Sequence, residues 1–580
     1  MIISGRGCGG LLICFLLFGI ATIILNTAAS ASAQTEDGRI VITAEEISKM
    51  KALRMADVLN QVPGVKAGES SVGIHGSYKV KVLLDGRPIN DPTSVHGGVK
   101  WDLIALENVE KIEILRGKGS LAHGDDASGG VILITTKKIQ SFSGNVKVFG
   151  GNYDTQSYNA NGRFTKKNFG GALSVAYDTT GGYKVNNDDE KRRAGAKLEY
   201  AIAESVDFAF SADHIEEEQG YSGTPDFPTP FSRVTSEMNS FSLLSRIKKV
   251  DAKTTFTGGL RHNTDVSRNL DQTLKVKNAG QDIHTSFDTG PWGNLDCGAA
   301  FAWGEAGGST LSRQEESSVA FFGAQSIPLK RWPLTVTVGL RGNFYSEFDG
   351  SLNPEIKAAW QKKTWNANLA YSRANNAPSF HQRYNRTSST RPNPDLGMEI
   401  TDNYSLSLFS QLGDALSGSV TLFYNELFER ITYVRGDDGF GQYQNIGQVT
   451  YQGVDLSLNW KITGNLTAKA NYTYLEARDE TNDLWLTAKP RHEASGELYF
   501  TPLEKLTLVA NIDYSSKVYT RSDNSQSAPA YAIYGLRGEY LIKPFNLFGE
   551  VKNLTDETYY YVDGGLAPPQ TWIIGVNWNF

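Results

Sequence analysis

Three stretches rich in Gly, Pro and charged residues, 216–233, 376–395 and 435–443, are expected to be loops, and they contain side chains suited to binding an anionic ligand. A guanidinium can make paired hydrogen bonds to an anion, and aromatic rings nearby add a stacking surface. This combination suits an anionic chelate. With Tyr78 from an earlier segment, the candidate ligand-binding residues are Tyr78, Tyr221, Phe227, Phe231, His381, Arg383, Tyr384, Arg386 and Arg391. For each residue taken singly, an ordinary place in a loop or an aromatic girdle is the better interpretation.

The sequence contains no recognisable catalytic set. Its eight His residues are scattered, with no pair at metal-ligand spacing on a helix. Neither a Gly-x-Ser-x-Gly elbow nor a Gly-Lys-Ser phosphate loop is present. The net charge of −6 also argues against nucleic-acid binding, which requires a basic face. We therefore expect neither an enzyme nor a nucleic-acid partner, and no bound metal or cofactor.

Short apolar segments separated by glycine turns organise residues 74–138. Val80, Val82 and Leu84 alternate up to Asp85-Gly86, the two-residue signal of a tight reversal. Two further strands are expected, one around Ile112 and Ile114 ending at Gly117, and one over Val131–Ile134 after Gly129-Gly130. Upstream, Thr43 and Glu46 have capping-box spacing, and Pro63-Gly64 ends a second amphipathic turn.

From about residue 141 the chain changes to long alternating segments. Leu334, Val336, Val338 and Leu340 share one face, and residues 454–460 and 466–474 form an expected hairpin around Thr463-Gly-Asn465. Such strands mark a lipid-facing barrel, which must close because backbone groups in a bilayer have to pair internally. The roughly 440 residues available allow about 22 strands, at roughly 20 residues for each strand and its connection.

The N-terminus has the features of a signal peptide. Arg6 supplies the positive charge, Leu11–Leu25 is apolar, and Ala31-Ser-Ala33 is a small-residue cleavage pattern, so the mature chain is expected to start near Gln34. Only Cys297 would then remain, and one cysteine forms no internal disulfide. Beyond the N-terminus no apolar run of 18 or more residues is free of charge, which excludes a bundle of membrane helices.

The order of segments in residues 40–138 resembles the plug domain of TonB-dependent outer-membrane transporters. Three barrel segments are also similar to that family: Ala377-Pro-Ser-Phe380 followed by Asn393-Pro-Asp-Leu396 and Glu399; Gln452-Gly-Val-Asp455; and Val551-Lys-Asn-Leu-Thr-Asp556. The resemblance implies an all-β transmembrane barrel of about 22 antiparallel strands with a small α+β plug domain in its lumen. The expected divisions are a signal peptide (1–33), the N-terminal segment and plug (34–139), and the barrel (140–580).

The resemblance also implies contacts that hold the plug in the barrel. Carried over from the family, Arg116 would face Glu399 and Asp455; the alternative is that Arg116 is a solvated strand end and both acids are ordinary lumen residues. His75 stands where the family usually has Arg. We therefore include it in the plug–barrel contact and hypothesise that this contact weakens as His75 loses its proton near neutral pH.

The family couples to TonB, of the TonB–ExbB–ExbD complex, through a segment upstream of the plug. Ile40, Val41, Ile42, Thr43 and Ala44 resemble that segment in composition, although a first plug strand is the favoured interpretation. The terminal Phe580 ends an alternating strand and resembles the signal read by the barrel-assembly machinery. A monomer surrounded by outer-membrane lipid is expected.

Active uptake of a scarce metal chelate across the bacterial outer membrane is the function that the resemblance implies. A ferric siderophore is the favoured substrate, with cobalamin (vitamin B12) or haem as alternatives. Haem receptors of the family place a ligand histidine where His381 stands, but Asn375-Asn-Ala-Pro378 departs from the family's Phe-Arg-Ala-Pro motif. A passive porin, or a phage or adhesion receptor, is the hypothesis from a different class.

Overall fold

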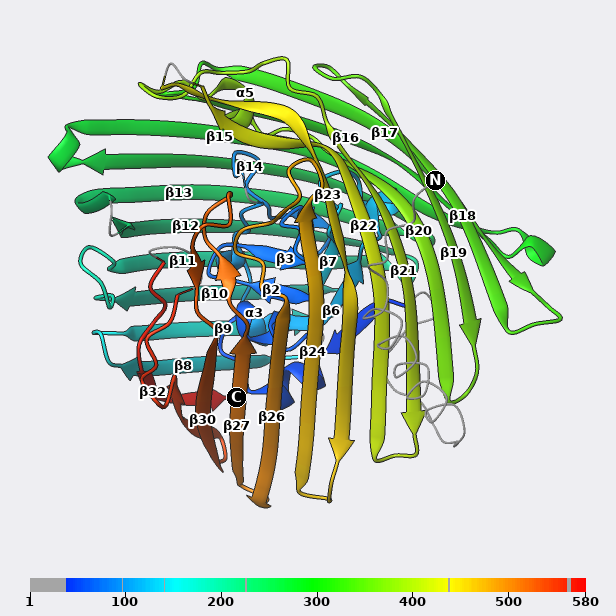
Figure 1. Cartoon of the computed structure of the whole chain (residues 1–580). Helices are drawn as coiled ribbons and strands as arrows, with labels where there is room; N and C mark the ends of the chain where they lie inside the picture. Colours follow the sequence, from blue (N-terminus) through cyan, green and yellow to red (C-terminus); the bar gives the residue numbers. More distant parts are fainter. Residues whose placement is uncertain (1–37, 96, 140, 225–226, 437–438, 561–564) are drawn as a thin grey trace, which may run out of the picture.

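The computed structural model describes residues 38–580 except 96, 140, 225–226, 437–438 and 561–564. The expected signal peptide, 1–33, lies outside the described residues. Figure 1 shows the N-terminal elements, drawn in blue, enclosed by the long strands of the rest of the chain. We call the described residues up to Thr136 the plug and residues 143–580 the barrel.

The plug is a five-stranded mixed sheet with short helices around it. The order of the sheet is β1-β6-β7-β4-β5, with β4 parallel to β7 and the other pairs antiparallel. Its elements are β1 (Ile40–Thr43), α2 (Ala44–Met50), α3 (Met55–Leu59), β2 (Val65–Ala67), β3 (Val72–Ile74), β4 (Val80–Leu84), β5 (Arg87–Pro88), η1 (Trp101–Leu103), η2 (Leu106–Asn108), β6 (Val109–Arg116), α4 (Ser120–His123) and β7 (Gly130–Thr136).

Local sequence explains how these elements start and turn. Thr43 and Glu46 form the capping box that opens α2, as their spacing predicts. Asp85 and Gly86 both have positive φ, which is what a tight hairpin between β4 and β5 requires. Gly130 also has positive φ, and a Cβ there would lie 2.1 Å from the Leu115 oxygen, so only glycine lets β7 pair so closely with β6.

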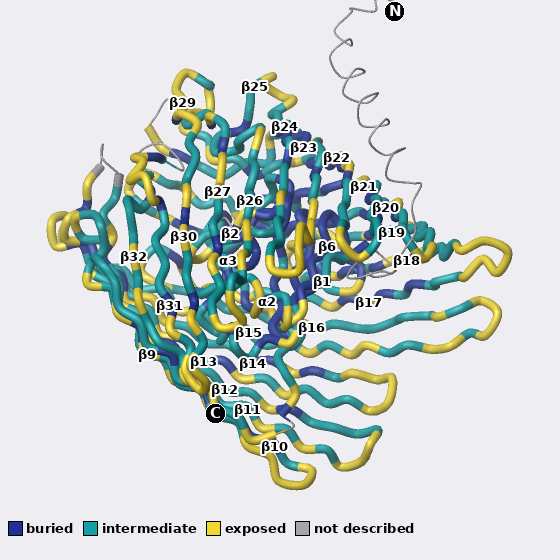
Figure 2. The backbone as a smooth tube through the Cα atoms, turned by 90° about the horizontal axis from the view of Figure 1, so that it is seen from below, coloured by how far each residue is buried: buried dark blue, intermediate teal, exposed yellow. Residues whose placement is uncertain are grey.

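The hydrophobic core of the protein lies inside the plug. Ile112, Ile114, Ile132 and Ile134 of the central strands are almost completely buried and belong to one apolar cluster with the helices α2 and α3. Figure 2 shows buried residues concentrated around this enclosed part, and exposed residues at the hairpin tips of the barrel.

The barrel is closed and consists of 22 antiparallel strands, which confirms the predicted fold class. Its strands are β8 (Ser143–Gly151), β9 (Gln156–Lys166), β10 (Phe169–Thr180), β11 (Asp189–Ala203), β12 (Val206–Thr224), β13 (Phe227–Ile247), β14 (Val250–Asp265), β15 (Leu270–Asp288), β16 (Asn294–Gly308), β17 (Gln314–Leu329), β18 (Leu334–Tyr345), β19 (Ser351–Gln361), β20 (Trp365–Asn376), β21 (Glu399–Leu412), β22 (Leu416–Arg435), β23 (Gly441–Lys461), β24 (Leu466–Asp479), β26 (His492–Leu503), β27 (Leu506–Ser515), β30 (Tyr531–Ile542), β31 (Phe545–Lys552) and β32 (Thr571–Asn579). Short accessory elements are η3 (Val266–Arg268), η4 (Gly290–Trp292), α5 (Phe380–Tyr384), β25 (Leu484–Trp485), β28 (Val518–Tyr519) and β29 (Ser527–Ala528).

The outside of the barrel is apolar because the strands alternate. Leu173 and Val175 of β10 are more than half exposed, and Leu458 and Trp460 of β23 are almost half exposed. The barrel closes where β32 pairs with β8, and the Phe580 backbone exchanges two hydrogen bonds with Gly144. No helix in the described part of the chain is long and apolar enough to cross a membrane.

The two ends of the barrel differ. Connections such as 167–168, 248–249 and 462–465 are short, and we call their end the short-turn end. The opposite, long-loop end carries 377–398, with α5, and the described residues of 553–570. The expected loop at 216–233 is wrong: apart from the undescribed 225–226, these residues extend β12 and β13, which makes these two strands 19 and 21 residues long.

Candidate functional site

A buried carboxylate joins the barrel to the plug. Asp455 of β23 is almost inaccessible to solvent, and its Oδ2 lies 2.6 Å from Arg116 Nη1 and 2.7 Å from His75 Nε2. Arg116 stands at the end of β6 and also donates to the Pro63 carbonyl. We call this contact the Asp455 junction. Its two plug donors converge on one oxygen, so the barrel carboxylate compensates the buried guanidinium charge.

Hydroxyl groups complete the Asp455 junction from the two neighbouring strands. Thr421 of β22 and Thr473 of β24 occupy the positions directly opposite Asp455 in the strand register. Thr473 donates to Asp455 Oδ1 at 2.9 Å, and Arg116 Nη2 donates to Thr421 Oγ1 at 2.8 Å. The Gly64 N–H donates to Thr473 Oγ1, and a Cβ on Gly64 would lie 2.7 Å from Asp455 Oδ2. Glycine therefore allows the plug backbone to approach this closely.

The surroundings of His75 favour its neutral form. Its ring stacks on Phe423 of β22 at 3.6 Å between centroids, and its Nδ1 is buried without a hydrogen-bond partner. Burial lowers the pKa of His75; Asp455 opposes that shift, whereas Arg116 on the same carboxylate adds to it. Asp455 supplies the carboxylate that the hypothesis requires, and the lowered pKa of His75 shifts the expected loss of its proton below neutral pH. Protonation would leave a buried N–H unpaired at Nδ1, so charging requires more acidic conditions.

Glu399 lies away from the Arg116 guanidinium contacts. Its Oε1 accepts from the Ile431 N–H at 2.9 Å, and its Oε2 accepts from the Asn376 amide at 3.1 Å. The same Asn376 amide donates to Ser128 of the plug. The structure thus connects Glu399 to the plug through Asn376, while Arg116 pairs with Asp455.

A second contact holds the β4–β5 hairpin. Arg87 lies 2.8 Å from Asp213 of β12, and Lys197 of β11 lies 3.2 Å from Asp85. Lys253 of β14 donates to the Gly86 carbonyl. The tight turn at Asp85-Gly86 therefore lies against four consecutive barrel strands, because Arg87 also donates to a hydroxyl of β13.

A third contact is the plug loop after α4, against β18–β20. Asp125 Oδ1 accepts from the amides of Asn353 and Asn343, at 3.0 and 3.3 Å. Burial raises the pKa of Asp125 to about 7; the nearby Arg341 opposes that shift and Asp126 adds to it. Neutral amides bond this carboxylate directly, in contrast to Asp455.

Arg383 of α5 stabilises the loop in which it lies. Arg383 is buried, pairs with Glu316 of β17 and donates to the Pro394 carbonyl. Its guanidinium lies over the rings of Phe348 and Tyr384, at 4.4 and 4.6 Å. His381 Nε2 lies 3.3 Å from the Asn385 amide, so the local contacts of α5 engage both side chains.

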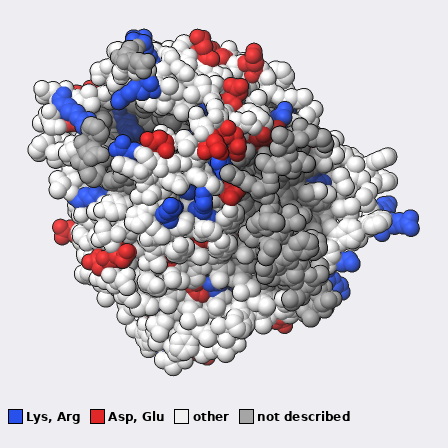
Figure 3. Space-filling view, viewed as in Figure 1, with Lys and Arg blue, Asp and Glu red and all other residues white. Residues whose placement is uncertain are grey.

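Cationic side chains lie over aromatic rings at the long-loop end. Lys489 Nζ is 3.6 Å from the ring centroid of Tyr78, and Arg491 lies 3.4 Å from that of Trp485. Arg391 lies 4.3 Å from the Phe440 ring. Burial lowers the pKa of Lys489 to about 7. The face drawn in Figure 3 is hollowed at its upper left, where Lys and Arg side chains lie near the rim.

The remaining candidate residues are spread apart. Tyr221 shares a strand face with Asp213, which meets the plug, whereas Phe231 shares the outer face of β13 with the exposed Phe241 and Leu243. Arg386 is exposed in the loop after α5. The side chain of Phe227 lies outside the described residues. The structure therefore does not bring all nine candidate residues to one site.

The segment expected to couple to TonB is part of the plug sheet. Residues 40–43 form β1, an edge strand that pairs with β6 from Ile40 opposite Ile114 to Thr43 opposite Lys111, and Ala44 starts α2. Arg39 adds an ion pair to Glu113 of β6 at 2.9 Å. Since β6 ends at Arg116, one strand connects this segment to the Asp455 junction.

Metal ligation has no support in the geometry. Within the described residues, no group of three or more His, Cys, Asp or Glu side chains is arranged to hold a metal ion. Asp188, which starts the acidic run before β11, is paired through both oxygens with Arg233 at 2.7 Å.

Comparison with known families places the chain. Residues 32–131 match the model of the TonB-dependent receptor plug domain, and residues 137–554 match that of the TonB-dependent receptor-like β-barrel. The chain belongs to the TonB-dependent receptor family. It is accordingly an outer-membrane β-barrel of a family of receptors and transporters, and membership implies interaction with TonB.

Relatives within this family are named for different ligands. The vitamin B12 transporter BtuB of Photobacterium profundum is 23% identical over 90% of this chain and 88% of its own length. The ferric enterobactin receptor of Pseudomonas aeruginosa is 23% identical over 92% of this chain and 90% of its own.

Two solved structures share the fold. A mutant of the Pseudomonas aeruginosa ferric enterobactin receptor PfeA in complex with enterobactin superimposes with a TM-score of 0.80 at 17% identity, covering 95% of this chain and 100% of that one. The ferric citrate transporter FecA gives a TM-score of 0.79, also at 17% identity and with the same coverage.

Sequence reasoning missed several residues at the contacts of this TonB-dependent receptor. Thr421 and Thr473 become visible only through the strand register around Asp455, and Phe423 through the ring stack with His75. Gly64 had a signal, the Pro63-Gly64 pair, but it was interpreted only as a helix stop. No sequence motif around Lys489 indicates its contact with Tyr78.

Proposed function

We propose that this receptor takes up an anionic iron chelate, a ferric siderophore, across the bacterial outer membrane. The long-loop end would face outward and the short-turn end the periplasm, since long loops of such barrels are extracellular. The observation that supports this substrate class is the contact of plug Tyr78 with Lys489, together with the Arg491–Trp485 and Arg391–Phe440 pairs at the same end of the barrel. Cations over rings suit ligands that are anionic and aromatic.

Uptake would begin when the chelate contacts the plug and TonB engages the N-terminal segment around Ile40–Ala44. Force on β1 is transmitted to β6, which pairs with it and ends at Arg116. Separating Arg116 from Asp455 would release the plug from β22–β24. The plug–barrel contacts in this mechanism are polar, so they can be broken and remade without exposing the apolar core.

The same proposal covers export, assembly and the oligomeric state of the protein. A signal peptide over residues 1–33 would export the chain, and the barrel-assembly machinery would recognise the terminal Phe580. The mature receptor would function as a monomer in lipid, with no catalytic activity of its own.

Cobalamin is the second candidate substrate, because BtuB of Photobacterium profundum is among the relatives that align along nearly the whole chain. Haem has less support, since His381 Nε2, the atom that would ligate iron, lies within hydrogen-bond distance of Asn385. A passive pore also has little support, because the plug fills the lumen and contacts strands all around it.

Ligand binding tests the proposal. Purified receptor would be titrated with ferric enterobactin, ferric citrate, haem and cyanocobalamin, with Trp485 among the fluorescent reporters. We expect saturable binding of one iron chelate, weakened about tenfold by Lys489→Gln, which corresponds to about 1.4 kcal/mol. Lys363→Gln in a short turn is the matched control. Binding of cyanocobalamin alone would reject the siderophore in favour of the second candidate.

The pH dependence of binding sharpens this test. Lys489 loses its charge as the pH rises through about 7, so affinity for an anionic chelate should fall between pH 6 and pH 8. In the Lys489→Gln variant, the affinity should fall less between pH 6 and pH 8, because no ammonium group is left to lose its charge there. An affinity that rises with pH in the unmodified receptor would contradict a role for the Lys489 ammonium group.

A further inference from the structure

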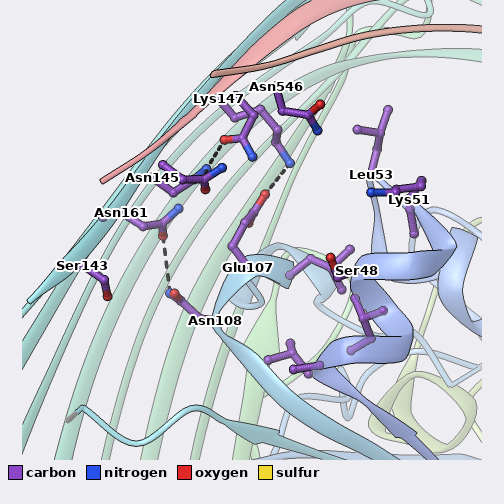
Figure 4. A pocket seen from close by; sticks show the side chains of 18 of the residues that line it. Ser48, Lys51, Leu53, Glu107, Asn108, Ser143, Asn145, Lys147, Asn161 and Asn546 are labelled. Atoms are coloured by element: carbon purple, nitrogen blue, oxygen red, sulfur yellow. Dashed lines mark hydrogen bonds and ion pairs between the residues drawn. The ribbon is translucent and has the colours of Figure 1, made fainter. Parts of the chain in front are cut away.

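A cavity of about 440 Å³ lies between the plug and the barrel wall at the short-turn end. Helix α2 and the segment after it form one side, and β8, β9 and β30–β32 form the other. Figure 4 shows Glu107 and Asn108 between the helix that carries Ser48 and the barrel wall that carries Asn145 and Lys147. Its volume falls in the range of sites for small ligands.

The lining of this cavity is positively charged. Counted over side chains alone, five basic and two acidic residues contribute to it, which gives a formal surplus of three positive charges. The basic residues are Lys51, Lys137, Lys147, Arg163 and Arg537, and the acidic residues are Glu107 and Glu539. A cavity whose walls carry one sign of charge raises the local concentration of ions of the opposite sign.

The two acidic residues of the lining contact the basic side chains around them. Glu539 lies 2.7 Å from Arg537 and 3.0 Å from Lys51. The Glu107 side chain pairs with Lys147, and its backbone carbonyl accepts from Lys137 Nζ at 2.9 Å. Arg537 also lies 3.3 Å from Glu550, whereas Lys137 and Arg163 have no carboxylate of the lining as a direct partner. The acidic residues therefore position part of the basic set and leave positive charge in the cavity.

Asparagine amides supply further polar groups. The lining includes Asn108, Asn145, Asn161, Asn546, Asn577 and Asn579. Asn145 is more than nine-tenths buried, and its Oδ1 has no hydrogen-bond partner. A buried polar atom left unpaired is costly and indicates a place for an additional hydrogen-bonding group.

We propose that this cavity is a second binding site for the anionic chelate, occupied as the chelate leaves the plug for the periplasm. The proposal rests on the proposed function. One wall is α2, which follows β1 directly, so force on the N-terminal segment would move that wall and widen the cavity. The ligand would be an oxygen-rich anion, which ammonium and guanidinium groups bind by charge-assisted hydrogen bonds.

Thiol labelling tests the predicted preference for anions. Ser48→Cys places a thiol on the cavity wall, and Gly464→Cys places one in a short turn where a Cβ meets nothing within 4 Å. Purified full-length receptor would react with sulfonatoethyl and trimethylammonioethyl methanethiosulfonate, followed by peptide mass spectrometry. The anionic-to-cationic rate ratio should be about tenfold higher at position 48 than at position 464. Equal ratios would overturn the proposal.

Charge removal links this preference to transport. Lys51→Gln with Lys147→Gln should bring the ratio at position 48 close to that at position 464, whereas Lys363→Gln with Lys505→Gln should leave it unchanged. In cells, the first pair should slow uptake of ferric enterobactin severalfold while surface binding stays intact. Unchanged uptake in the Lys51→Gln, Lys147→Gln receptor would overturn the proposal that this cavity binds the chelate. Absence of ferric enterobactin binding to the unmodified receptor would instead count against the proposed function, because the labelling ratio does not depend on that ligand.

Discussion

Two carboxylates between plug and barrel, the buried Asp455 and the half-buried Asp125, are compensated differently. Asp455 of the barrel receives the Arg116 guanidinium and the His75 ring at one oxygen and the Thr473 hydroxyl at the other. Asp125 of the plug receives two amides, from Asn343 and Asn353. One charge is paired across the interface, whereas the other is bonded directly by neutral groups.

The difference predicts two kinds of attachment. Forming a buried charge pair changes the free energy little, because desolvation offsets the attraction. Removing one partner of the pair is strongly destabilising, because it leaves the other charge buried without compensation. A carboxylate that only amides bond directly has a raised pKa, so its contribution depends on pH. The Asp455 junction therefore holds the plug over a wide pH range, and the Asp125 contact adds an attachment that varies near neutral pH.

The largest expected effect is that of Asp455→Asn. It leaves the Arg116 charge buried without a counter-charge, which should lower the free energy of plug opening by about 3–5 kcal/mol. Opening can be measured in urea by the labelling rate of Leu121→Cys, a plug position buried against Phe322 and Ala324 of β17. Asp402→Asn is the control, because that carboxylate pairs with Arg373 inside the barrel. Equal effects of the two variants would contradict the comparison.

The second prediction concerns the pH dependence of plug opening. The folded pKa of Asp125, about 7, lies above its unfolded value near 4, so its contribution to stability is present at low pH and is lost as the pH rises towards 7. The groups that face it include Lys81, Arg341 and Asp126, which Asp125→Asn leaves in place. That variant should flatten the decline between pH 4 and 7 in the same labelling measurement. If the free energy of plug opening declined with the same slope in Asp125→Asn, Asp125 would not be the cause of the decline.

The smallest expected effect is that of Thr473→Val. This change removes one hydroxyl bond to Asp455 and one acceptor for the Gly64 N–H, while the charge pair remains. The plug-opening free energy should fall by about 1 kcal/mol. A loss as large as that of Asp455→Asn would show that the hydroxyl, rather than the charge pair, dominates the junction.

The fold followed from patterns that sequence displays directly. Alternation in segments such as Leu334–Leu340 and chain length predict a closed barrel of about 22 strands, because lipid leaves few alternatives. The prediction of a loop at 216–233 was wrong. Charged residues and proline favour a loop, whereas β12 and β13 continue as strands through most of this stretch.

The site could be predicted only in part. Arg116 and Asp455 were associated through motifs of the family, but their partners Thr421 and Thr473 depend on how β22, β23 and β24 align, which no local pattern encodes. The protonation of His75 depends on burial and on an unpaired Nδ1, both of them tertiary properties. Lys489 meets Tyr78 only because a barrel loop folds onto the plug.

A double-mutant cycle between Arg116→Ala and Asp455→Ala tests the central claim most directly, that a charge pair across the interface holds the plug in the barrel. The measured quantity is the free energy of plug opening from Leu121→Cys labelling. Each single change should cost several kcal/mol, and the double change should cost less than their sum by about 2 kcal/mol, because it removes the uncompensated charge. Additive effects of the two changes would contradict the account.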